Sequence, residues 1–381
     1  MIYFDNAATT QRKPHEVVDA VCASLGSFGG PGRGSHGPAI EASMALYRAR
    51  DAVARLLNVP GGASRVSFAM NATMALNIAI DALLPAGGRA VTTAASHNSV
   101  LRPLFRARDE RACSVGVARI APDGSLDDDS YARELAEGAD LVVATHASNV
   151  TGDVYDVARM ADAAHDAGAL FVLDAAQTAG AWPLDMAALG VDVVCFTGHK
   201  SLYGPQGTGG LAVREGLDVA PLLEGGSGVR SFEERHPRVM PEALEAGTAN
   251  AHGAAGLAAG VEHVLATGVP AIAARAGALV DQFERGVACI PGVRIYGGHA
   301  SAGRTGVVAF NLGGADSGEV AARLWQDFAI CVRPGAHCAP LMHEALGTVE
   351  QGIVRASFCD FNTEAEVDEA ISAIRQIAAQ L

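Results

Sequence analysis

Only two of the 28 basic residues in this chain are lysines, Lys13 and Lys200. Arginine stays protonated and cannot act as an amine nucleophile, so a lysine retained in such an arginine-rich chain is a candidate for chemistry. Lys13 precedes Pro14 in a polar stretch near the start of the chain, and we expect it to be a solvated charge. Lys200 closes the run Thr197-Gly198-His199-Lys200 directly after an apolar segment. It is the stronger candidate for a reactive amine.

A carboxylate occupies an equivalent place after another apolar run, where residues 170–173 end at Asp174 and lead to Gln177. The carboxyl ends of parallel strands meet at one edge of a sheet, so we expect Asp174 and Lys200 to lie close together. One interpretation is a structural ion pair. The other is a pyridoxal phosphate site, in which the lysine binds the aldehyde and the aspartate keeps the pyridine nitrogen protonated, so that the ring withdraws electrons.

The remaining parts of such a site can be sought in the sequence. A phosphate needs backbone N–H groups at a helix N-terminus together with a hydroxyl, and Thr73 stands where a predicted helix begins. Thr73 also has an ordinary explanation as a helix cap. Thr197 and His199 flank Gly198 and can supply further phosphate donors. His97 follows another predicted strand and can lie flat on the cofactor ring, although an isolated histidine is more often structural.

Short β-rich runs alternate with helical patterns, which predicts an α/β fold with a mostly parallel sheet covered on both faces. The predicted strands of this sheet are 66–70, 90–93, 115–120, 141–145, 170–173, 193–196 and 210–213. The pattern changes near Ala251, where one long Ala-rich helix over about 253–288 joins a smaller α+β lobe. In that lobe we expect strands at 293–296, 307–312 and 353–357, with helices at 317–327 and from 364.

The expected domain organisation has three parts. Residues 1–15 form an N-terminal segment that joins the small domain, residues 16–250 form the large cofactor-binding domain, and residues 251–381 form the linking helix and the small C-terminal domain. The Gly- and Pro-rich stretches 29–38 and 225–247 read as loops long enough to have a function.

Composition excludes several classes of protein. Of 381 residues, 49% are hydrophobic and 18% are charged, which argues against disorder. A net charge of −14 without a basic run argues against binding to nucleic acid or to an anionic membrane surface. Seven cysteines without a C-x-x-C pair favour neither a disulfide framework nor a thiolate metal site, and we expect no metal. With no signal peptide and no long apolar span, the expected location is the cytoplasm.

The motifs together resemble the cysteine desulfurase and selenocysteine lyase family, within the class V aminotransferase group of fold-type I pyridoxal phosphate enzymes. The motifs that carry the resemblance occur in family order almost from end to end: Tyr3–Thr10, Asp174–Gln177, Gly198–Lys200, Glu245–Asn250, Arg333–Pro340, Val354–Ser357 and Phe361–Thr363. The resemblance implies a large domain with a mostly parallel seven-stranded sheet and a smaller α+β domain.

The resemblance also implies a role for individual residues. Lys200 binds the pyridoxal phosphate aldehyde, Asp174 the pyridine nitrogen and Gln177 the ring oxygen, while His97 stacks on the ring. The other implied contacts are Asn149 with the ring, Thr73, Thr197 and His199 with the phosphate, and Thr248 with the phosphate of a neighbouring subunit in a homodimer. Arg355 matches the arginine that binds the substrate carboxylate, a task suited to guanidinium, and Arg33 and His36 match residues at the mouth of the site.

Cys338 determines the branch of the family. It follows Arg333 and His337 in a short turn-forming run, and such neighbours favour the nucleophilic thiolate. The resemblance in this region is to the short-loop, group II desulfurases. Cys331 is expected to pack in the strand before this loop. Cys359 departs from the family pattern, as does Asp360 beside it, and we expect that thiol to be structural.

The function implied is conversion of L-cysteine to L-alanine with a persulfide left on Cys338 for transfer to a sulfur-acceptor protein, as in iron–sulfur cluster assembly. L-Selenocysteine is a second candidate substrate. Two alternatives stay open at this point. One is another class V reaction without a persulfide, such as an aminotransferase or a C–S β-lyase, and the other is a non-catalytic relative that binds a partner.

Overall fold

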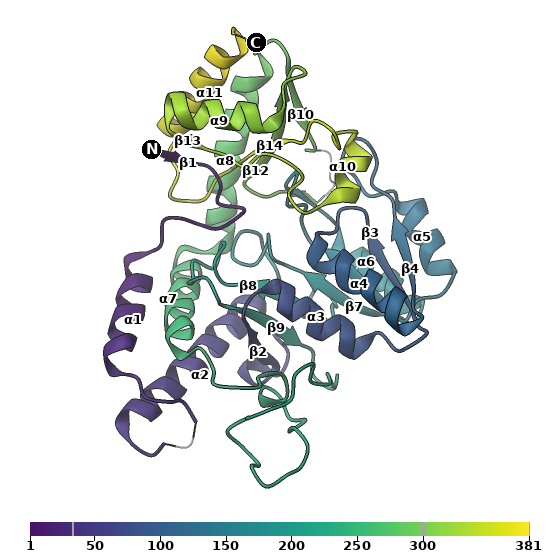
Figure 1. Ribbon diagram of the computed structural model, residues 1–381, viewed down its shortest axis with the longest axis vertical. Coiled ribbons are helices and arrows are strands. Elements are labelled where there is room, and N and C mark those ends of the chain that lie inside the picture. Colours follow the sequence, from purple (N-terminus) through teal and green to yellow (C-terminus); the bar gives the residue numbers. More distant parts are fainter. Residues whose placement is uncertain (33, 299–301, 381) are drawn as a thin grey trace.

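The computed structural model in Figure 1 describes residues 1–32, 34–298 and 302–380. Its centre is a seven-stranded sheet in the order β2-β9-β8-β7-β5-β3-β4. The strands are β2 (Val66–Ala69), β3 (Arg89–Thr93), β4 (Ser114–Ala118), β5 (Leu141–Thr145), β7 (Leu170–Asp174), β8 (Val193–Thr197) and β9 (Gly209–Val213). Strand β9 is antiparallel to both of its neighbours, and all the other pairs are parallel. The predicted seven-stranded, mostly parallel sheet is therefore confirmed.

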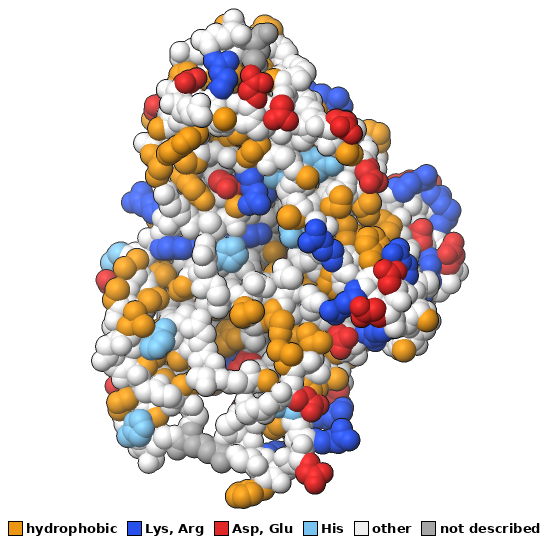
Figure 2. All heavy atoms as spheres, in the orientation of Figure 1, with side chains coloured by type: hydrophobic (Ala, Val, Ile, Leu, Met, Phe, Trp, Pro, Cys, Tyr) orange, Lys and Arg blue, Asp and Glu red, His pale blue; other side chains and the backbone are white. Residues whose placement is uncertain are grey.

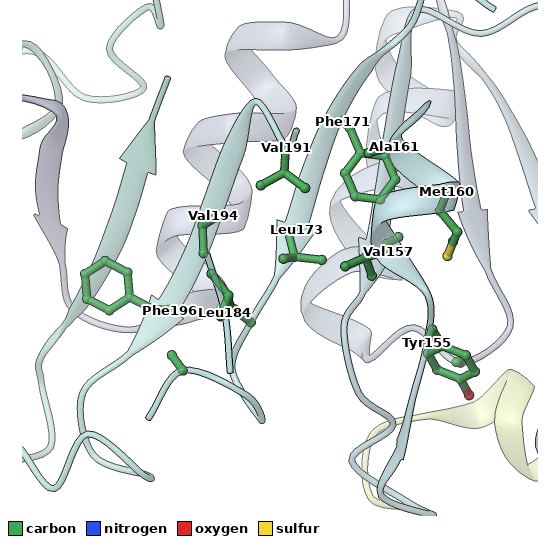
Figure 3. Packing of buried hydrophobic residues seen from close by; sticks show 14 of the residues in the cluster. Tyr155, Val157, Met160, Ala161, Phe171, Leu173, Leu184, Val191, Val194 and Phe196 are labelled. Atoms are coloured by element: carbon green, nitrogen blue, oxygen red, sulfur yellow. The ribbon is translucent and has the colours of Figure 1, made fainter. Parts of the chain in front are cut away.

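The strands alternate between two buried faces. Phe171 and Leu173 of β7 lie on the same face as Val194 and Phe196 of β8, whereas Val172 belongs to the core on the opposite face. Figure 3 shows the first face, where these side chains meet residues of α6. The helices that flank the sheet are α2 (Gly37–Leu57), α5 (Asp128–Ala136) and α6 (Val157–Asp166) on the first face, with α3 (Ala72–Leu83) and α4 (Asn98–Arg111) on the second. The apolar cores on the two faces of the sheet thus hold the strands in place, and with them the residues at the strand ends.

The Ala-rich region does not form the single long helix that we expected. It forms α7 (Ala251–Thr267) and α8 (Val269–Ala288), which are bent by 80° at Gly268. Gly268 has a φ of 85°, a conformation that glycine adopts without strain. Pro270 then starts the second helix, where a proline is well tolerated. Helix α7 packs on α1 (His15–Ser27) and α2, so it belongs to the packing of the large sheet domain.

The smaller lobe stands at the top of Figure 1, around the antiparallel sheet β10-β12-β14. Its elements are β10 (Val293–Tyr296), β12 (Val307–Leu312), β14 (Val354–Ser357), α9 (Ser317–Phe328) and α11 (Glu364–Ala378). Strand β1 (Ile2–Tyr3) pairs with β13 (Ile330–Cys331), and Ile2 and Phe4 enter the core of this lobe. The start of the chain is thereby attached to its C-terminal part, although the domain boundaries at 15 and 250 stay predictions.

The other described elements are short: η1 (Gly62–Arg65), β6 (Asp153–Val154), η2 (Glu242–Leu244), β11 (Gly303–Arg304) and α10 (Pro340–Leu346). In the described part of the chain no single helix is both long and apolar enough to cross a membrane, although the bent pair α7–α8 meets that criterion when the two are taken together. The described residues contain no group of three or more His, Cys, Asp or Glu side chains placed to hold a metal ion.

Gly260 of α7 tests how closely this helix approaches the turn after Lys200, and Gly277 of α8 is the control. A Cβ atom at Gly260 would lie 2.2 Å from the backbone oxygen of Leu202, whereas one at Gly277 of α8 would meet no heavy atom within 4 Å. We expect Gly260→Ala to lower the free energy of unfolding by about 1–3 kcal/mol through this overlap. Gly277→Ala should raise it by about 0.5–1 kcal/mol, because glycine is a poor helix former. Urea denaturation measures both, and a stabilised Gly260→Ala protein would contradict this close packing of α7.

Candidate active site

Four neighbouring strands, β8, β7, β5 and β3, deliver polar residues to the carboxyl edge of the sheet. A cavity of about 160 Å³ opens there. Its lining contains every cofactor residue nominated from the sequence except Thr248: Thr73, His97, Asn149, Asp174, Gln177, Thr197, His199 and Lys200. These residues lie up to 127 positions apart in the chain (200 − 73), so the order of the strands in the sheet is what brings them together.

A tight turn after β8 holds Lys200. The Gly204 N–H donates to the oxygen of Gly198 at 2.8 Å, and the Tyr203 N–H donates to that of Lys200 at 2.9 Å. Residue 198 must be small, because a Cβ there would lie 2.1 Å from Oγ1 of Thr208. The glycine of the Gly-His-Lys run is therefore required by steric fit, whatever the chemical role of the histidine and lysine.

Lys13 corrects one prediction. It is half-buried, and its Nζ donates to the backbone oxygen of His199 at 2.9 Å. That oxygen also accepts from the N–H of Thr10 at 3.2 Å and from the hydroxyl of Thr10 at 3.1 Å. Desolvation lowers the pKa of Lys13 to about 8. The expectation of a freely solvated charge was wrong, because this side chain fastens the N-terminal segment to the turn before Lys200.

Burial dominates the electrostatics of the cavity. Desolvation lowers the pKa of Lys200 to about 8, and the charge of Asp174 opposes that shift. Burial raises the pKa of Asp174, while its hydrogen bond from the Ala176 N–H, at 3.0 Å, and the charge of Lys200 lower it. Burial and then the charge of Lys200 lower the pKa of His97 to about 4. Near neutral pH the site therefore contains an uncharged imidazole and an amine that releases its proton readily.

Several buried polar atoms of the cavity have no hydrogen-bond partner among the described residues. They are Oγ1 of Thr197, Nδ1 of His199, Oδ1 of Asn149 and Oγ1 of Thr145. The N-terminus of α3 opens on the same cavity, with Asn71 as its cap. A phosphate suits the helix end, hydroxyl and imidazole, and a protonated pyridine nitrogen suits Asp174. The residues present therefore fit pyridoxal phosphate, and unpaired buried atoms of this kind call for a bound group.

Cys338 stands beside this cavity on a closely held loop. Arg333 pairs with Arg355 of β14 through two backbone hydrogen bonds of 3.1 and 2.8 Å. Nδ2 of Asn149 donates to the oxygen of His337 at 2.7 Å, and the Asn98 N–H donates to that of Cys338, also at 2.7 Å. Both His337 and Cys338 have positive φ, 49° and 56°, a conformation that costs energy in a residue with a side chain. The thiol is exposed at the end of this strained pair.

The histidine before Cys338 has a structural position. Its ring stacks on His343 of α10 with centroids 5.8 Å apart, and burial lowers the pKa of His337 to about 3. The imidazole is therefore uncharged near neutral pH. Arg333 is exposed and supplies the positive charge of this loop.

Arg355 is buried between the two ends of the chain. Its Nη1 donates to the oxygen of Asn149 at 2.7 Å, its Nη2 contacts Oδ1 of Asp5 at 3.1 Å, and its Nε has no partner among the described residues. Desolvation lowers the pKa of Arg355 to about 10, with Asp5 opposing the shift, so the guanidinium stays charged. It offers a fixed cation next to Asn149 and to the cavity.

Two nominated residues lie away from this cavity, and a third is not described. Thr248 is exposed and lines a separate hollow of about 330 Å³. His36 is exposed and caps α2, accepting from the Ala39 N–H at 3.4 Å. Arg33 lies outside the described residues. The roles assigned to these three stay predictions.

Thr145 and Asp5 were not nominated from the sequence, whereas Asn71 belongs to the run Asn71-Ala72-Thr73 that we expected at a phosphate-binding helix start. Thr145 is the last residue of β5, so its place at the carboxyl edge was a signal that could have nominated it. The structure makes Asn71 the N-cap of α3, which begins at Ala72, one residue before the predicted start at Thr73. Asp5 had no local signal, since its partner Arg355 is 350 residues away.

The lowered pKa of Lys200 predicts how the apoprotein takes up its cofactor. Only the neutral amine binds an aldehyde, so the rate of pyridoxal phosphate binding should rise about tenfold per pH unit below the pKa and level off above it. We expect the midpoint at about pH 8. Asp174→Asn removes the charge that raises this pKa and should move the midpoint to lower pH. Stopped-flow absorbance measures the rate, and a midpoint near 10.5, the ordinary lysine value, would contradict the desolvated site.

Comparison with known proteins places this geometry in a family. The family model described as aminotransferase class-V matches residues 2–370. A probable cysteine desulfurase of Methanothermobacter thermautotrophicus is 32% identical over 99% of this chain and 94% of its own length. A cysteine desulfurase of Haloferax volcanii is 31% identical over 98% of this chain and 88% of its own.

Solved structures agree. The apo structure of a cysteine desulfurase from Thermococcus onnurineus superimposes with a TM-score of 0.93 at 33% identity, covering 100% of this chain and 95% of that one. The cysteine desulfurase CsdA of Escherichia coli gives 0.89 at 28% identity, again over 100% and 95%. The proteins of this family are pyridoxal phosphate-dependent. The chain belongs to the aminotransferase class-V family and groups with its cysteine desulfurases.

Proposed function

We propose that this protein is a pyridoxal phosphate-dependent cysteine desulfurase that converts L-cysteine to L-alanine and carries the released sulfur as a persulfide on Cys338. One observation carries the proposal. The exposed Cys338 lines a hollow that shares Thr73, His97 and Ser99 with the cavity containing Lys200. The thiol and the amine therefore line adjoining spaces, and both can act on the same small amino acid.

When bound, the cofactor draws electrons from the α-carbon of the amino acid. Lys200 takes the α-proton, a role suited to an amine whose pKa is about 8. Asp174 holds the proton on the pyridine nitrogen, and the uncharged His97 covers the ring. Gln177 is half-buried at the cavity and is available to the ring oxygen.

Cys338 performs the sulfur step. Its thiolate attacks the sulfur of the substrate, a new S–S bond forms, and the C–S bond breaks with its electron pair left on the carbon fragment that becomes alanine. The strained positive-φ pair His337–Cys338 and the hydrogen bonds to Asn98 and Asn149 hold the thiol near the cavity. Such fixed placement lowers the entropic cost of the attack.

Arg355 binds the carboxylate of the substrate. A buried guanidinium with an unpartnered Nε suits a planar anion. Asp5 and the backbone oxygen of Asn149 keep its orientation when no substrate is present. The proposal also includes Arg33 and His36 as contacts at the mouth of the site.

The proposal includes a homodimer. Thr248 lines a hollow with Met70, Met74 and Leu223, away from the cavity of its own chain, and Met70 and Leu223 are more than half exposed. Covering this apolar surface with a second copy supplies a reason for dimerisation and brings the Thr248 hydroxyl to the phosphate of the other site.

The proposed setting is the cytoplasm, and all seven cysteines are unpaired, as suits a reducing compartment. The sulfur goes to an acceptor, with iron–sulfur cluster assembly as one use, and L-selenocysteine is a second substrate to be tested. The division into a segment 1–15, a large domain 16–250 and a small domain 251–381 is proposed on the same basis.

Replacement of the nucleophile tests the proposal. With L-cysteine, the wild-type protein should gain one sulfur atom on Cys338 and release one alanine per persulfide, as measured by mass spectrometry and amino-acid analysis. Cys338→Ser should form no persulfide and lose roughly 100-fold or more of its alanine production. Cys22→Ser, which removes another exposed thiol on α1, should behave as wild type. Pyruvate and ammonia in place of alanine would indicate a C–S β-lyase and contradict the proposal.

A second variant tests the carboxylate contact. Arg355→Lys keeps the charge and loses the planar pair of donors, so we expect KM for L-cysteine to rise by about tenfold or more, with the visible absorbance of bound cofactor unchanged. Steady-state kinetics with L-cysteine measures the change. An unchanged KM would show that the substrate carboxylate binds elsewhere.

A further inference from the structure

Cys338 lines a hollow with two arginines that have no role in the proposed conversion of cysteine to alanine. The hollow has a volume of about 280 Å³ and is lined by Arg102, Arg106 and Asn77 in addition to the residues around the thiol. Arg102 and Arg106 lie one turn apart on α4, and both are exposed. Side chains four residues apart on a helix are neighbours, so the two guanidinium groups act on the same space.

These two arginines differ from others on the same helix. Arg108 pairs with Asp109 at 2.8 Å, and Arg111 pairs with Asp81 at 3.1 Å. Within the described part of the chain neither Arg102 nor Arg106 forms an ion pair, and Arg106 donates only to Oδ1 of Asn77, at 3.4 Å. Within the described residues, no ion pair therefore compensates the charges of Arg102 and Arg106.

The local charge opposes that of the whole chain. The protein has a net charge of −14, yet the described lining of this hollow contains no carboxylate. Figure 2 shows basic side chains over α4 on the face that is in view, with acidic side chains among them. The hollow also lies at the N-terminal half of α4, where the helix dipole adds positive potential. A small anion is therefore attracted to the space directly beside the Cys338 thiol.

We infer that this hollow binds a small thiol bearing two carboxylates, which takes the sulfur from Cys338. Guanidinium groups match carboxylates in geometry and charge, and the volume suits a small molecule. The inference rests on the proposed function for the origin of the persulfide, whereas anion binding beside the thiol does not depend on it.

The transfer step is balanced without an added oxidant. The thiolate of the acceptor attacks the outer sulfur of the persulfide, and a new S–S bond forms. The S–S bond to Cys338 breaks, and its electron pair leaves on the Cys338 thiolate. The acceptor becomes a persulfide, and the enzyme regains its free thiol. Arg102 and Arg106 bind the carboxylates and bring the acceptor sulfur into line with that bond.

The first experiment measures anion attraction without turnover. The holoenzyme carries Cys22→Ser and Cys289→Ser, which removes the other two exposed thiols, and a protein that also carries Cys338→Ser gives the background. The Cys338 thiol of the holoenzyme is treated with a dianionic disulfide, dithiobis-nitrobenzoate, and in a separate reaction with an uncharged disulfide, dithiodipyridine. Arg102→Gln with Arg106→Gln should slow the dianionic reagent about tenfold at low ionic strength and change the uncharged reagent less than about twofold. Arg108→Gln on the same helix is the matched control and should leave both rates unchanged.

The second experiment follows sulfur transfer. The Cys338 persulfide is formed with one equivalent of L-cysteine, and its loss to mercaptosuccinate, a dianion, is compared with its loss to uncharged thioglycerol. The ratio of the two rates should fall about tenfold in the double arginine variant, since the intrinsic reactivity of each thiol cancels in that comparison.

Equal slowing of both disulfides would mean that the variant distorts the loop, and unchanged rates would mean that the arginines do not act on the thiol. Either result overturns the inference. If no persulfide forms, the proposed function fails, and the disulfide rates still decide whether the anion site exists. If the anion effect appears with disulfides but not in transfer, the hollow is not an acceptor site.

Discussion

Lys200 and Asp174 share one desolvated cavity, and the rest of the site is arranged around them. Removing an amine from water disfavours its charged form, while a nearby carboxylate favours it, and the balance leaves the pKa of Lys200 at about 8. The same burial raises the pKa of Asp174, so its carboxylate is a stronger hydrogen-bond acceptor. The strands β8, β7 and β5, whose ends carry these residues, are buried almost throughout. A more exposed lysine would remain protonated and would be a poor nucleophile.

The first residues of the chain connect this cavity to the small lobe. Asp5 contacts Arg355, and the Ala7 N–H donates to Oγ of Ser357 at 2.9 Å, so both reach β14. A few residues later, Thr10 and Lys13 bind the backbone oxygen of His199. One short segment therefore fixes the carboxylate-binding arginine and the turn before the reactive amine relative to each other. That arrangement explains why a motif at the very start of the chain belongs with motifs near its end.

The sequence predicted the fold well where local patterns decide the structure. Each strand of the central sheet was located because a buried parallel strand is a short apolar run bounded by turns. The helix break at Gly268 was missed, since both Ala-rich halves have a helical pattern, although the proline at position 270 was a usable signal. The pairing of Ile2 with Ile330 could not be predicted from a local pattern, because the two residues are far apart in the sequence.

In the candidate site too, residues marked by a local pattern were predicted and contacts between distant segments were not. Asp174, Thr197 and Lys200 were found because they follow predicted strands, and their neighbours came from the resemblance. The contacts of Lys13 and Asp5 depend on segments about 190 and 350 residues away, which no spacing reveals. The consecutive left-handed conformations of His337 and Cys338 also escaped prediction, because positive φ is uncommon in residues other than glycine.

The presence of only two lysines makes the central claim directly measurable. Borohydride reduction of the holoenzyme fixes the cofactor to the amine that carries it, and peptide mass spectrometry then locates the pyridoxyl group. We predict that it is found on the peptide containing Lys200 and that Lys13 is unmodified. A pyridoxyl group on Lys13, or none on either lysine, would contradict a cofactor site centred on Lys200 and Asp174.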